Sequence, residues 1–267
     1  MSQDGDYYSN YGELSVGEYA NRFIRSSKIE MNRIIQIMQY FPEDINSVLD
    51  VGAGFGILLE ELEKRRGIKG VGIEITDSKI EYAKRNGIDM RKGEASKLDF
   101  PNKNFDVVVA CELLEHLPFG KYEAALVELI RVARKYIIIS VPHNERRTFV
   151  KCPYCGTSTN PSYHLRSFDE KSMINLFAGA KLEGIKTLGQ KLEVPWYHWL
   201  NKNRHTNWPE FLVCPSCGFR NTSLSRQSSD NQNDSIHKNA LKEIAYKMLA
   251  MLGRRKGQWI VGIYSIS

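Results

Sequence analysis

Strand patterns and helix patterns alternate along most of this chain, and that alternation limits the fold more than any other feature. Short apolar runs at Gly70–Ile75, Phe105–Ala110 and Tyr136–Val141 are separated by segments with helical spacing. Such runs are typical of strands covered by helices on both faces. Strands that alternate with helices form a mainly parallel sheet. The sequence therefore predicts an α/β fold of the doubly wound, Rossmann-like type.

The expected elements begin with an N-terminal helical cap over residues 1–46. It contains a helix over Glu18–Phe41. Strands are expected at Ser47–Val51, Gly70–Ile75, Phe105–Ala110, Tyr136–Val141, Lys181–Leu188 and Trp259–Ile266. Helices are expected at Ile57–Arg66, Ser78–Asn86, Tyr122–Ala133 and Asp169–Ala178, the last starting at a capping-box pattern from Ser167 to Glu170.

Residues 47–267 are expected to form one α/β domain that is interrupted twice. The last two strands lie too far apart in sequence for a plain connection, so residues 195–257 are predicted to be an insertion. Within it we expect a polar linker over Ser223–Ser235 and a helix over Asn239–Leu252. A smaller interruption is expected at 151–156, and each interruption carries a cysteine motif.

Composition excludes several classes of protein. The chain has 267 residues, of which 42% are apolar and 25% charged, as in ordinary globular proteins and unlike disordered or collagen-like chains. No segment approaches the roughly 18 consecutive apolar residues of a membrane span, and the N-terminal residues carry no secretory signal pattern. A cytoplasmic location is therefore expected.

A glycine-rich loop, VLDVGAGFG, follows the first expected strand and opens a helix. Glycines in that position let the backbone approach a ligand closely. Ile57 stands where a nicotinamide fingerprint has its third glycine. Asp50 would attract an ammonium group and repel a pyrophosphate, and Glu74 can accept hydrogen bonds from both hydroxyls of a ribose. Adenosine with a cationic amino-acid tail is S-adenosylmethionine, which we predict as the cofactor.

With these motifs the chain resembles the class I S-adenosylmethionine-dependent methyltransferases. The matching stretches are VLDVGAGFG, GVGIEI, KGEASKLDFPNKNFDVVVACELLEHL and IIISVPHNE. The resemblance runs from Ser47 to about Leu188 and resumes at Trp259. It implies a seven-stranded sheet whose last strand is antiparallel.

The family resemblance also assigns roles to individual positions. The residue at Glu74 binds ribose and Ile75 packs on adenine. Glu94, in place of the usual Asp, contacts the adenine amino group together with the backbone of Ala95. Cys111 and Glu112 flank the methionine tail. The predicted cofactor-binding residues are Asp50, Gly52, Ala53, Gly54, Gly56, Glu74, Ile75, Glu94, Ala95, Cys111 and Glu112.

Two histidines are candidate general bases, because a hydroxyl or protonated amine acceptor must lose a proton. His116 follows the strand at Phe105–Ala110, and His143 follows the strand at Tyr136–Val141. Both therefore lie at the sheet edge where ligands bind in open α/β folds. The alternative for His116 is a purely local packing or hydrogen-bonding role.

Four of the five cysteines form two CPxCG motifs, Cys152 with Cys155 and Cys214 with Cys217. Two such turns can complete a tetrahedral site with four cysteine ligands, so we predict one structural zinc ion in an element that resembles a zinc ribbon. A redox dithiol is the alternative for each pair alone. The fifth cysteine, Cys111, is expected to be a small buried side chain.

The methyl acceptor is the most open question. The insertion 195–257 holds 10 Lys and Arg against 4 Asp and Glu, which equals the net charge of +6 of the whole chain. Aromatic and basic residues alternate there, at Trp196, Tyr197, His198, Trp199, Lys202, Arg204, His205 and Trp208. They could stack on bases or sugars, or form the core of the zinc element.

Three hypotheses remain for the whole chain. In the first, the insertion closes over a small-molecule acceptor, which can be sugar- or lipid-linked, and an O or N atom receives the methyl group. The segment His164–Phe168 supports it by resembling a segment of small-molecule methyltransferases. In the second, the insertion docks RNA by tracking phosphates. In the third, the chain binds cofactor and a protein partner without turnover. The oligomeric state is left open.

Overall fold

The computed structural model describes residues 27–193, 208–209, 212–219 and 254–266. The chain divides into two compact units. The first comprises residues 1–146, 164–189 and 258–267, and the second comprises 147–163 and 190–257. The predicted linker at Ser223–Ser235, the predicted helix at Asn239–Leu252 and residues 196–205 of the aromatic stretch lie outside the described residues.

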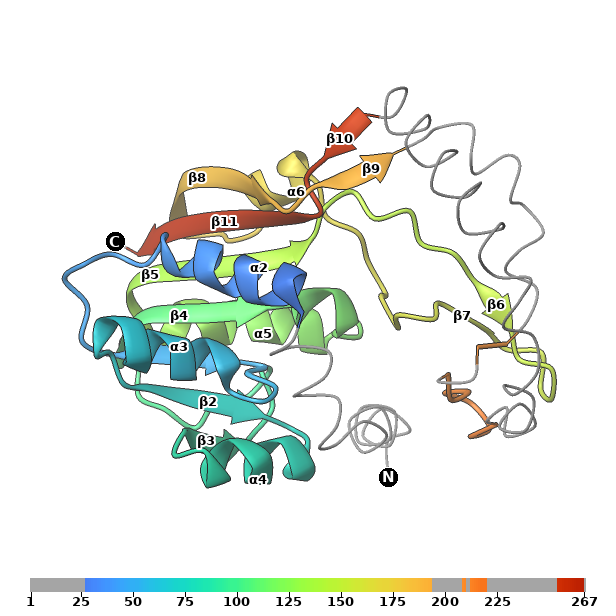
Figure 1. Ribbon diagram of the computed structural model, residues 1–267, viewed down its shortest axis with the longest axis horizontal. Helices are drawn as coiled ribbons and strands as arrows, with labels where there is room; N and C mark the ends of the chain where they lie inside the picture. Colours follow the sequence, from blue (N-terminus) through green and yellow to red (C-terminus); the bar gives the residue numbers. More distant parts are fainter. Residues whose placement is uncertain (1–26, 194–207, 210–211, 220–253, 267) are drawn as a thin grey trace, which may run out of the picture. The chain divides into compact units, whose positions relative to one another are not determined.

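The first unit is built on a seven-stranded sheet (Figure 1). In spatial order its strands are β3 (Asp89–Lys92), β2 (Gly70–Glu74), β1 (Val48–Val51), β4 (Phe105–Cys111), β5 (Ala133–Pro142), β11 (Trp259–Ile266) and β8 (Ala180–Leu188). β11 is antiparallel to both of its neighbours, and the other adjacent strands are parallel. The predicted Rossmann-like sheet with an antiparallel last strand is confirmed.

Helices cover both faces of this sheet. α2 (Lys28–Met38) and α3 (Ile57–Arg66) lie in front of it in Figure 1, and α5 (Lys121–Val132) lies behind it. The apolar residues of β4 alternate accordingly. Val107 and Val109 pack in the core layer of α2, α3 and α4 (Asp77–Arg85), whereas Val108 and Ala110 pack in the layer of α5 and α6 (Glu170–Ile174). Burial on both faces explains why these strands are continuously apolar.

One strand of the seven-stranded sheet was not predicted from the sequence. β3 has exposed Asp89, Arg91 and Lys92 around a buried Met90, at the edge of the sheet. Charged side chains are common on edge strands, where they discourage pairing with other chains. Because the alternation is short and the residues are polar, this segment carries no strand signal, and only its pairing with β2 reveals it.

Helix α6 corrects a predicted cap. The helix was expected over Asp169–Ala178 from a cap at Ser167, but it spans Glu170–Ile174 and its N-cap is Asp169. The Asp169 carboxylate accepts the Ser172 amide, and the Ser172 hydroxyl lies 2.8 Å from the Asp169 amide. Ser167 instead donates its hydroxyl to the carbonyl of Glu145. The Ser167 side chain therefore joins two loops and caps no helix.

The predicted helix–strand boundary near Ala133 is also shifted. α5 ends at Val132 and β5 begins at the next residue, so Arg134 and Lys135 belong to the strand. The N-terminal helix that was expected over Glu18–Phe41 is described from Lys28 to Met38. None of the helices in the described ranges is long and apolar enough to cross a membrane.

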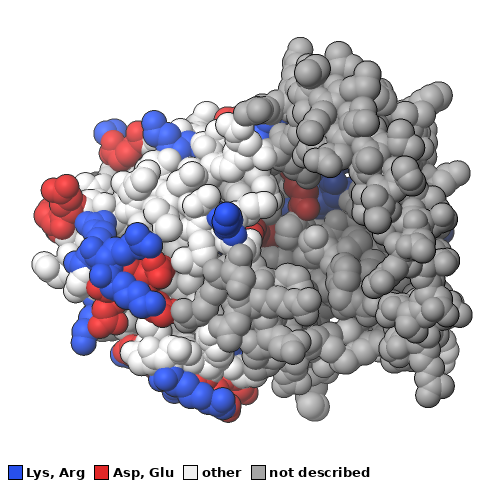
Figure 2. Space-filling view, in the orientation of Figure 1, with Lys and Arg blue, Asp and Glu red and all other residues white. Residues whose placement is uncertain are grey.

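Charges of both signs are mixed on the face of the molecule drawn in Figure 2. Helix α3 illustrates the pattern. Lys64 Nζ lies 2.6 Å from Glu60, and Arg65 Nε lies 2.7 Å from Glu61. Such i, i+4 pairs stabilise a helix by a few tenths of a kcal/mol each.

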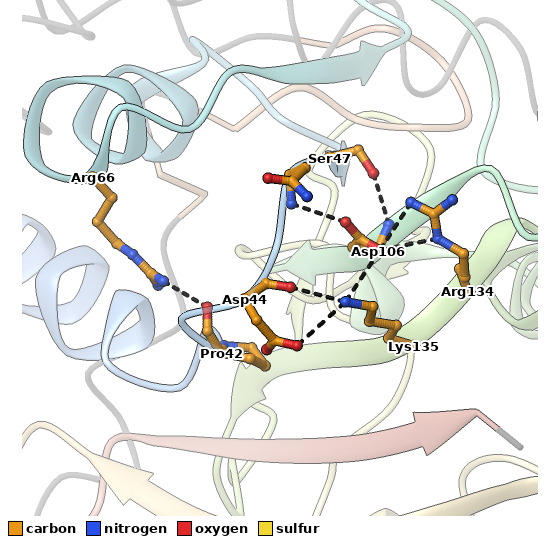
Figure 3. Close-up of polar contacts among 8 residues, drawn as sticks. Pro42, Asp44, Ser47, Arg66, Asp106, Arg134 and Lys135 are labelled. Atoms are coloured by element: carbon orange, nitrogen blue, oxygen red, sulfur yellow. Dashed lines mark hydrogen bonds and ion pairs between the residues drawn. The ribbon is translucent and has the colours of Figure 1, made fainter.

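The amino edge of the sheet holds a compact polar network around Asp106 (Figure 3). The buried Asp106 carboxylate accepts the Asn46 amide at 2.8 Å and Arg134 Nε at 2.9 Å. Lys135 donates to the carbonyl of Asp44 at 2.8 Å and lies 3.7 Å from Asp106. Burial raises the pKa of Asp106, but the Asn46 amide and the Arg134 guanidinium outweigh it and hold that pKa below its ordinary value.

The second unit contains two short antiparallel pairs. β6 (Val150–Lys151) pairs with β7 (Ser158–Thr159), and β9 (Lys191–Glu193) pairs with β10 (Arg254–Lys256). Trp208 is 5% exposed and donates its indole N–H to the Leu212 carbonyl. This Trp belongs to the core of the unit, as one of the two alternatives predicted.

Candidate active site

The glycine loop turns back onto β2 immediately after β1. The amides of Gly52 and Ala53 both donate to the carbonyl of Ile73, at 2.8 and 3.0 Å. Gly52 has a φ of 77°, and a Cβ at this position would lie 3.0 Å from a methyl carbon of Leu113. Only glycine fits such a backbone without strain. The loop therefore packs closely against the segment after β4.

Glu74 is fixed at the end of β2 by three backbone amides. Its Oε2 accepts the amide of Gly54 at 3.0 Å, and its Oε1 accepts those of Ile75 and Thr76 at 2.9 and 3.1 Å. A Cβ on Gly54 would meet nothing within 4 Å, so open space adjoins this amide. A carboxylate held in this way beside open space suits the two hydroxyls of a ribose.

Asp50 lies on β1, just before the loop, and is 3% exposed. Burial and the neighbouring Glu74 carboxylate raise its pKa to about 7, although Arg33 acts in the opposite direction. Cys111, at the end of β4, also has a raised pKa because of burial and the nearby Asp50, so its thiol keeps its proton. Both residues lie at the carboxyl ends of adjacent strands.

Glu94 has a partner of its own in this structure. Its Oε2 lies 2.7 Å from Lys121 Nζ, and hydrogen bonding to this ammonium lowers its pKa despite some burial. Ala95 beside it is buried, and Ile75 is partly buried. Both remain predicted contacts of the adenine.

Glu112 occupies a sharp turn directly after β4. Its φ is 52°, and its amide donates to the carbonyl of Ser140 on β5. Arg33, from α2, has one guanidinium nitrogen 3.9 Å from Glu112 Oε1 and another 2.9 Å from Glu30. Arg33 also lies over the ring of Trp259 at 5.2 Å. The N-terminal helix thus brings a cation to the carboxyl edge, which the sequence pattern had not predicted.

Glu115, in the 3-10 turn Leu114–His116, is fully buried. Neither of its carboxylate oxygens has a hydrogen-bond partner among the described residues, and the same holds for Glu112 Oε1. Burial, and next the charge of Glu112, raise the pKa of Glu115 well above its ordinary value. A buried acid without partners is costly unless another group compensates it.

Two histidines and a third glutamate complete this group. The ring centroids of His116 and His164 lie 4.7 Å apart, and the rings meet edge to face. His164 Nδ1 is in close contact with a carboxylate oxygen of Glu145. Ligand atoms of Glu115, His116 and His164 all lie within 4.8 Å of one another. We call Glu112, Glu115, His116, Glu145 and His164 the acid–histidine cluster.

Backbone contacts hold the two halves of the acid–histidine cluster together. The amide of Leu165 donates to the carbonyl of Glu115 at 2.7 Å. Arg166 donates to the carbonyl of Leu114 at 2.8 Å, and its guanidinium lies 3.9 Å from the ring centre of Tyr122. The loop that carries His164 is therefore locked onto the turn that carries Glu115.

His143, the other candidate base, is not part of this cluster. It follows β5, and its Nε2 lies 2.9 Å from a carboxylate oxygen of Glu170 and 2.8 Å from the side-chain nitrogen of Asn144. Its Nδ1 is buried without a hydrogen-bond partner among the described residues. A histidine paired with a carboxylate can act as a base, so His143 stays a prediction, as does His116.

Sequence patterns missed Arg33, Glu115 and Glu145 as site residues and used His164 only as part of a resembling segment. The close spacing of Glu112, Glu115 and His116 is a usable signal, because acidic and histidine side chains near one another along the chain are typical of metal and catalytic sites. Arg33 and Glu145 carry no comparable signal. Only the tertiary structure brings them to the carboxyl edge.

The four paired cysteines come together within the second unit. Cys152 Sγ lies 3.8 Å from Cys217 Sγ, and Cys155 Sγ lies 3.5 Å from Cys214 Sγ. Tetrahedral coordination with Zn–S bonds of about 2.3 Å separates sulfurs by about 3.8 Å, whereas a disulfide separates them by about 2.0 Å. Contacts with Thr157 lower the pKa of Cys155 to about 6, which favours a thiolate. The sulfur geometry fits one zinc ion and no disulfide.

The family model "Methyltransferase domain" matches residues 48–136, the segment from β1 into β5. A ubiquinone biosynthesis O-methyltransferase from Hahella chejuensis is 38% identical over 78 residues, covering 27% of this chain and 32% of that protein. The sterol 24-C-methyltransferase erg6 from Aspergillus fumigatus is 35% identical over 95 residues, covering 33% of this chain and 25% of that protein. The chain thus spans about a third or less of these relatives.

A solved structure of a SAM-dependent methyltransferase from Archaeoglobus fulgidus shares the fold across nearly the whole chain. It has a TM-score of 0.54 and 18% identity, and the match covers 92% of this chain and 97% of that one. At this identity the likeness concerns the fold alone. Residues 48–136 are thus similar to methyltransferase domains, and the chain shares the fold of the SAM-dependent methyltransferase from Archaeoglobus fulgidus.

Proposed function

We propose that the chain is an S-adenosylmethionine-dependent methyltransferase that acts on an O or N atom of a small-molecule acceptor. The observation that carries this proposal is the position of Glu74, whose carboxylate is oriented by three amides beside the open space at Gly54. Asp50 lies on the adjacent strand, where a carboxylate can pair with the ammonium group of the cofactor.

The bound cofactor supplies a methyl group that is already activated by its sulfonium. The protein therefore has to orient two molecules, and such positioning can lower a barrier by about 7–11 kcal/mol. Glu74 and the glycine loop would hold the adenosine end, and Asp50, Cys111 and Glu112 the methionine end. The acceptor would then have to bind at the same carboxyl edge, next to the methionine end.

A hydroxyl or ammonium acceptor also needs a group that takes its proton. His143 beside Glu170 and His164 beside Glu145 are both histidine–carboxylate pairs at this edge. The carboxylate orients the ring and stabilises the imidazolium that forms, which suits general base catalysis. An O-methyltransferase among the relatives favours an oxygen acceptor.

The charge distribution over the described residues favours a small acceptor over RNA. On the face drawn in Figure 2, basic side chains lie among acidic ones, unlike the basic stripe typical of RNA-binding surfaces. The basic segment 195–257 lies mostly outside the described residues. RNA therefore remains an outcome that the experiment has to separate.

We also propose that Cys152, Cys155, Cys214 and Cys217 hold one structural zinc ion. Four cysteine ligands leave no open position for a substrate, so the ion would stabilise the second unit without taking part in chemistry. Metal analysis of the purified chain should give one zinc per chain, and the double variant Cys155→Ser/Cys217→Ser should lose it. Disulfides detected by mass spectrometry in place of zinc would contradict this.

The main test uses methyl-labelled S-adenosylmethionine, the full chain and a total cell extract. We expect label in low-mass or lipid-extractable material, with Glu74→Ala inactive and Glu81→Ala, an exposed glutamate of α4, as active as wild type. Label that ribonuclease releases would establish the RNA alternative. Cofactor binding without transfer in any fraction would favour the hypothesis of a non-enzymatic binding protein.

A further inference from the structure

The acid–histidine cluster contains buried carboxylate oxygens that lack hydrogen-bond partners, and the proposed methyl transfer does not explain them. Glu115 is fully buried, and neither carboxylate oxygen has a hydrogen-bond partner among the described residues. Glu112 Oε1 is a third buried oxygen without a hydrogen bond, although Arg33 lies 3.9 Å from it. Burying a carboxylate without a partner costs several kcal/mol. A fold that keeps such a group is expected to compensate it with a ligand.

Nearby cations of the protein compensate the cluster only in part. Arg33 lies 2.9 Å from Glu30 and pairs with Glu112 Oε1 at 3.9 Å, which is too far for a hydrogen bond. Arg166 donates to two backbone carbonyls, those of Leu114 and Leu117. Since the Glu115 oxygens accept no hydrogen bond within the described ranges, an added cation has a reason to bind here.

The ligand atoms converge as a metal ion requires. Those of Glu115, His116 and His164 lie within 4.8 Å of one another, a spread that one ion can span with bonds of about 2.0–2.2 Å after small side-chain shifts. The contact between Glu145 and Nδ1 of His164 is the carboxylate–histidine arrangement that orients metal-binding imidazoles. In this arrangement Nε2 of His164 would be the ligand atom.

We propose that Glu115, His116 and His164 bind one divalent cation, with Glu112 as a further ligand. Two imidazoles with carboxylates favour Mn2+, Fe2+ or Zn2+ over Mg2+, which prefers oxygen ligands. This site is separate in chemistry from the four cysteines, which select a soft ion.

The cation has a role in the reaction that rests on the proposed function. Three or four protein ligands leave positions on an octahedral ion for a hydroxyl of the acceptor. The bound hydroxyl would lose its proton to water more readily, since a metal ion lowers the pKa of a bound oxygen. The oxygen then forms a bond to the methyl carbon while the C–S bond breaks and its electron pair returns to sulfur. This predicts hydroxylated acceptors.

Binding of Mn2+ to the full chain, followed by electron paramagnetic resonance, tests the site directly. Cysteine sites bind this hard ion weakly, so the signal reports the acid–histidine cluster. We expect one bound Mn2+ per chain with hyperfine coupling to imidazole nitrogen. Glu115→Gln and His164→Gln should each weaken Mn2+ binding at least tenfold.

Matched controls are Glu81→Gln on exposed α4 and His143→Gln, which lies outside the cluster, and both should bind Mn2+ like wild type. Thermal unfolding checks that each variant folds, and Glu112→Gln replaces any that does not. Wild-type affinity in both Glu115→Gln and His164→Gln, or a signal without nitrogen coupling, would overturn the proposal.

Cofactor binding is measured by calorimetry on the same samples, so the two proposals fail separately. Cofactor binding and label transfer without any bound Mn2+ would overturn the cation site and leave the methyltransferase. Bound Mn2+ without cofactor binding would overturn the methyltransferase proposal and leave the cation site. Label transfer that is lost after chelation and restored by Mn2+ is the result expected if both hold.

Discussion

The two edges of the central sheet handle their charges in opposite ways. At the amino edge, the Asp106 carboxylate meets the Asn46 amide and Arg134, and its pKa is lowered. At the carboxyl edge, Asp50 and Glu115 are equally buried but have raised pKa values. The ionised form of a buried carboxyl group is stabilised at the amino edge and destabilised at the carboxyl edge.

This difference follows from what each edge has to do. A polar group that only supports the fold can have all its partners within the chain, and the network around Asp106 does. A polar group that binds a ligand must leave some of its hydrogen-bonding positions open for that ligand. These open positions cost stability when the ligand is absent. We therefore expect substitutions at the amino edge to affect stability and those at the carboxyl edge to affect binding.

The largest expected effect is on cofactor binding. Glu74→Ala removes the carboxylate that would bind both ribose hydroxyls, and the loss of two hydrogen bonds to a charged group should weaken S-adenosylmethionine binding about 100-fold. Calorimetry measures the affinity, and thermal unfolding checks that the variant still folds, because three backbone amides lose their acceptor. If Glu74→Ala bound the cofactor like wild type, the carboxyl edge would have been assigned wrongly.

The next effect is on stability at the amino edge. Asp106→Asn keeps the shape but removes the charge that Arg134 and the Asn46 amide stabilise, so the free energy of unfolding should fall by about 2 kcal/mol. Because the pKa of Asp106 is lower in the folded chain, this contribution is present above about pH 4 and is lost as the pH falls through the folded value. Urea unfolding of wild type and variant at pH 7 and pH 3 measures the stability difference and its loss at low pH.

Cofactor affinity should be unchanged in Asp106→Asn, because this residue lies at the opposite edge of the sheet. A variant that loses both stability and cofactor binding would mean that the two edges do not act independently.

Replacing a buried acid by its amide should raise the free energy of unfolding at the carboxyl edge, whereas it should lower it at the amino edge. Glu115→Gln removes a buried acid whose raised pKa makes it take up a proton on folding near neutral pH, so the metal-free protein should become more stable by about 1 kcal/mol. Urea unfolding in the presence of a chelator compares wild type and variant under the same conditions. A loss of stability similar to that of Asp106→Asn would show that Glu115 has protein partners after all.

The smallest effect is a pH dependence of cofactor affinity. The pKa of Asp50 is about 7 in the folded chain and about 3.9 in an unfolded one, so folding favours its protonated form and ionisation occurs as the pH rises through about 7. Glu74 and Arg33 are the charged groups that act on it. Affinity for the cationic tail should rise by up to about tenfold between pH 6 and pH 8.

Asp50→Asn provides the control for that titration, because any pH dependence that remains belongs to the ligand or to other groups. A titration that persists unchanged in Asp50→Asn would remove Asp50 from the ammonium-binding role.

The sequence was sufficient for features that arise from local patterns. The apolar runs of β4 and β5 predicted strands, because burial on both faces leaves no polar positions. The loop VLDVGAGFG predicted a ligand site, because glycines between a strand and a helix let the backbone approach a ligand closely. The positive φ angles at Gly52 and Gly54 agree with this use of glycine. The paired CPxCG motifs predicted that four sulfurs would come together, and the structure confirms this.

The edge strand β3 and the cap of α6 were not predictable in this way. Met90 is the one buried residue of β3, so its pairing with β2 and not its hydrophobicity makes it a strand. Ser167 matches a capping pattern, yet its hydroxyl bonds to Glu145, which is far away in sequence. In both cases a long-range contact outweighs the local preference.

The sequence by itself determined six of the seven strands of the sheet, the glycine loop and the cysteine pairs, because each depends on residues close together along the chain. Only the tertiary structure decided that Arg33, Glu115, Glu145 and His164 share one edge of the sheet. These residues lie on α2, after β4, after β5 and before α6, and no local pattern links them. Their charges interact because parallel strands bring their carboxyl ends to the same edge.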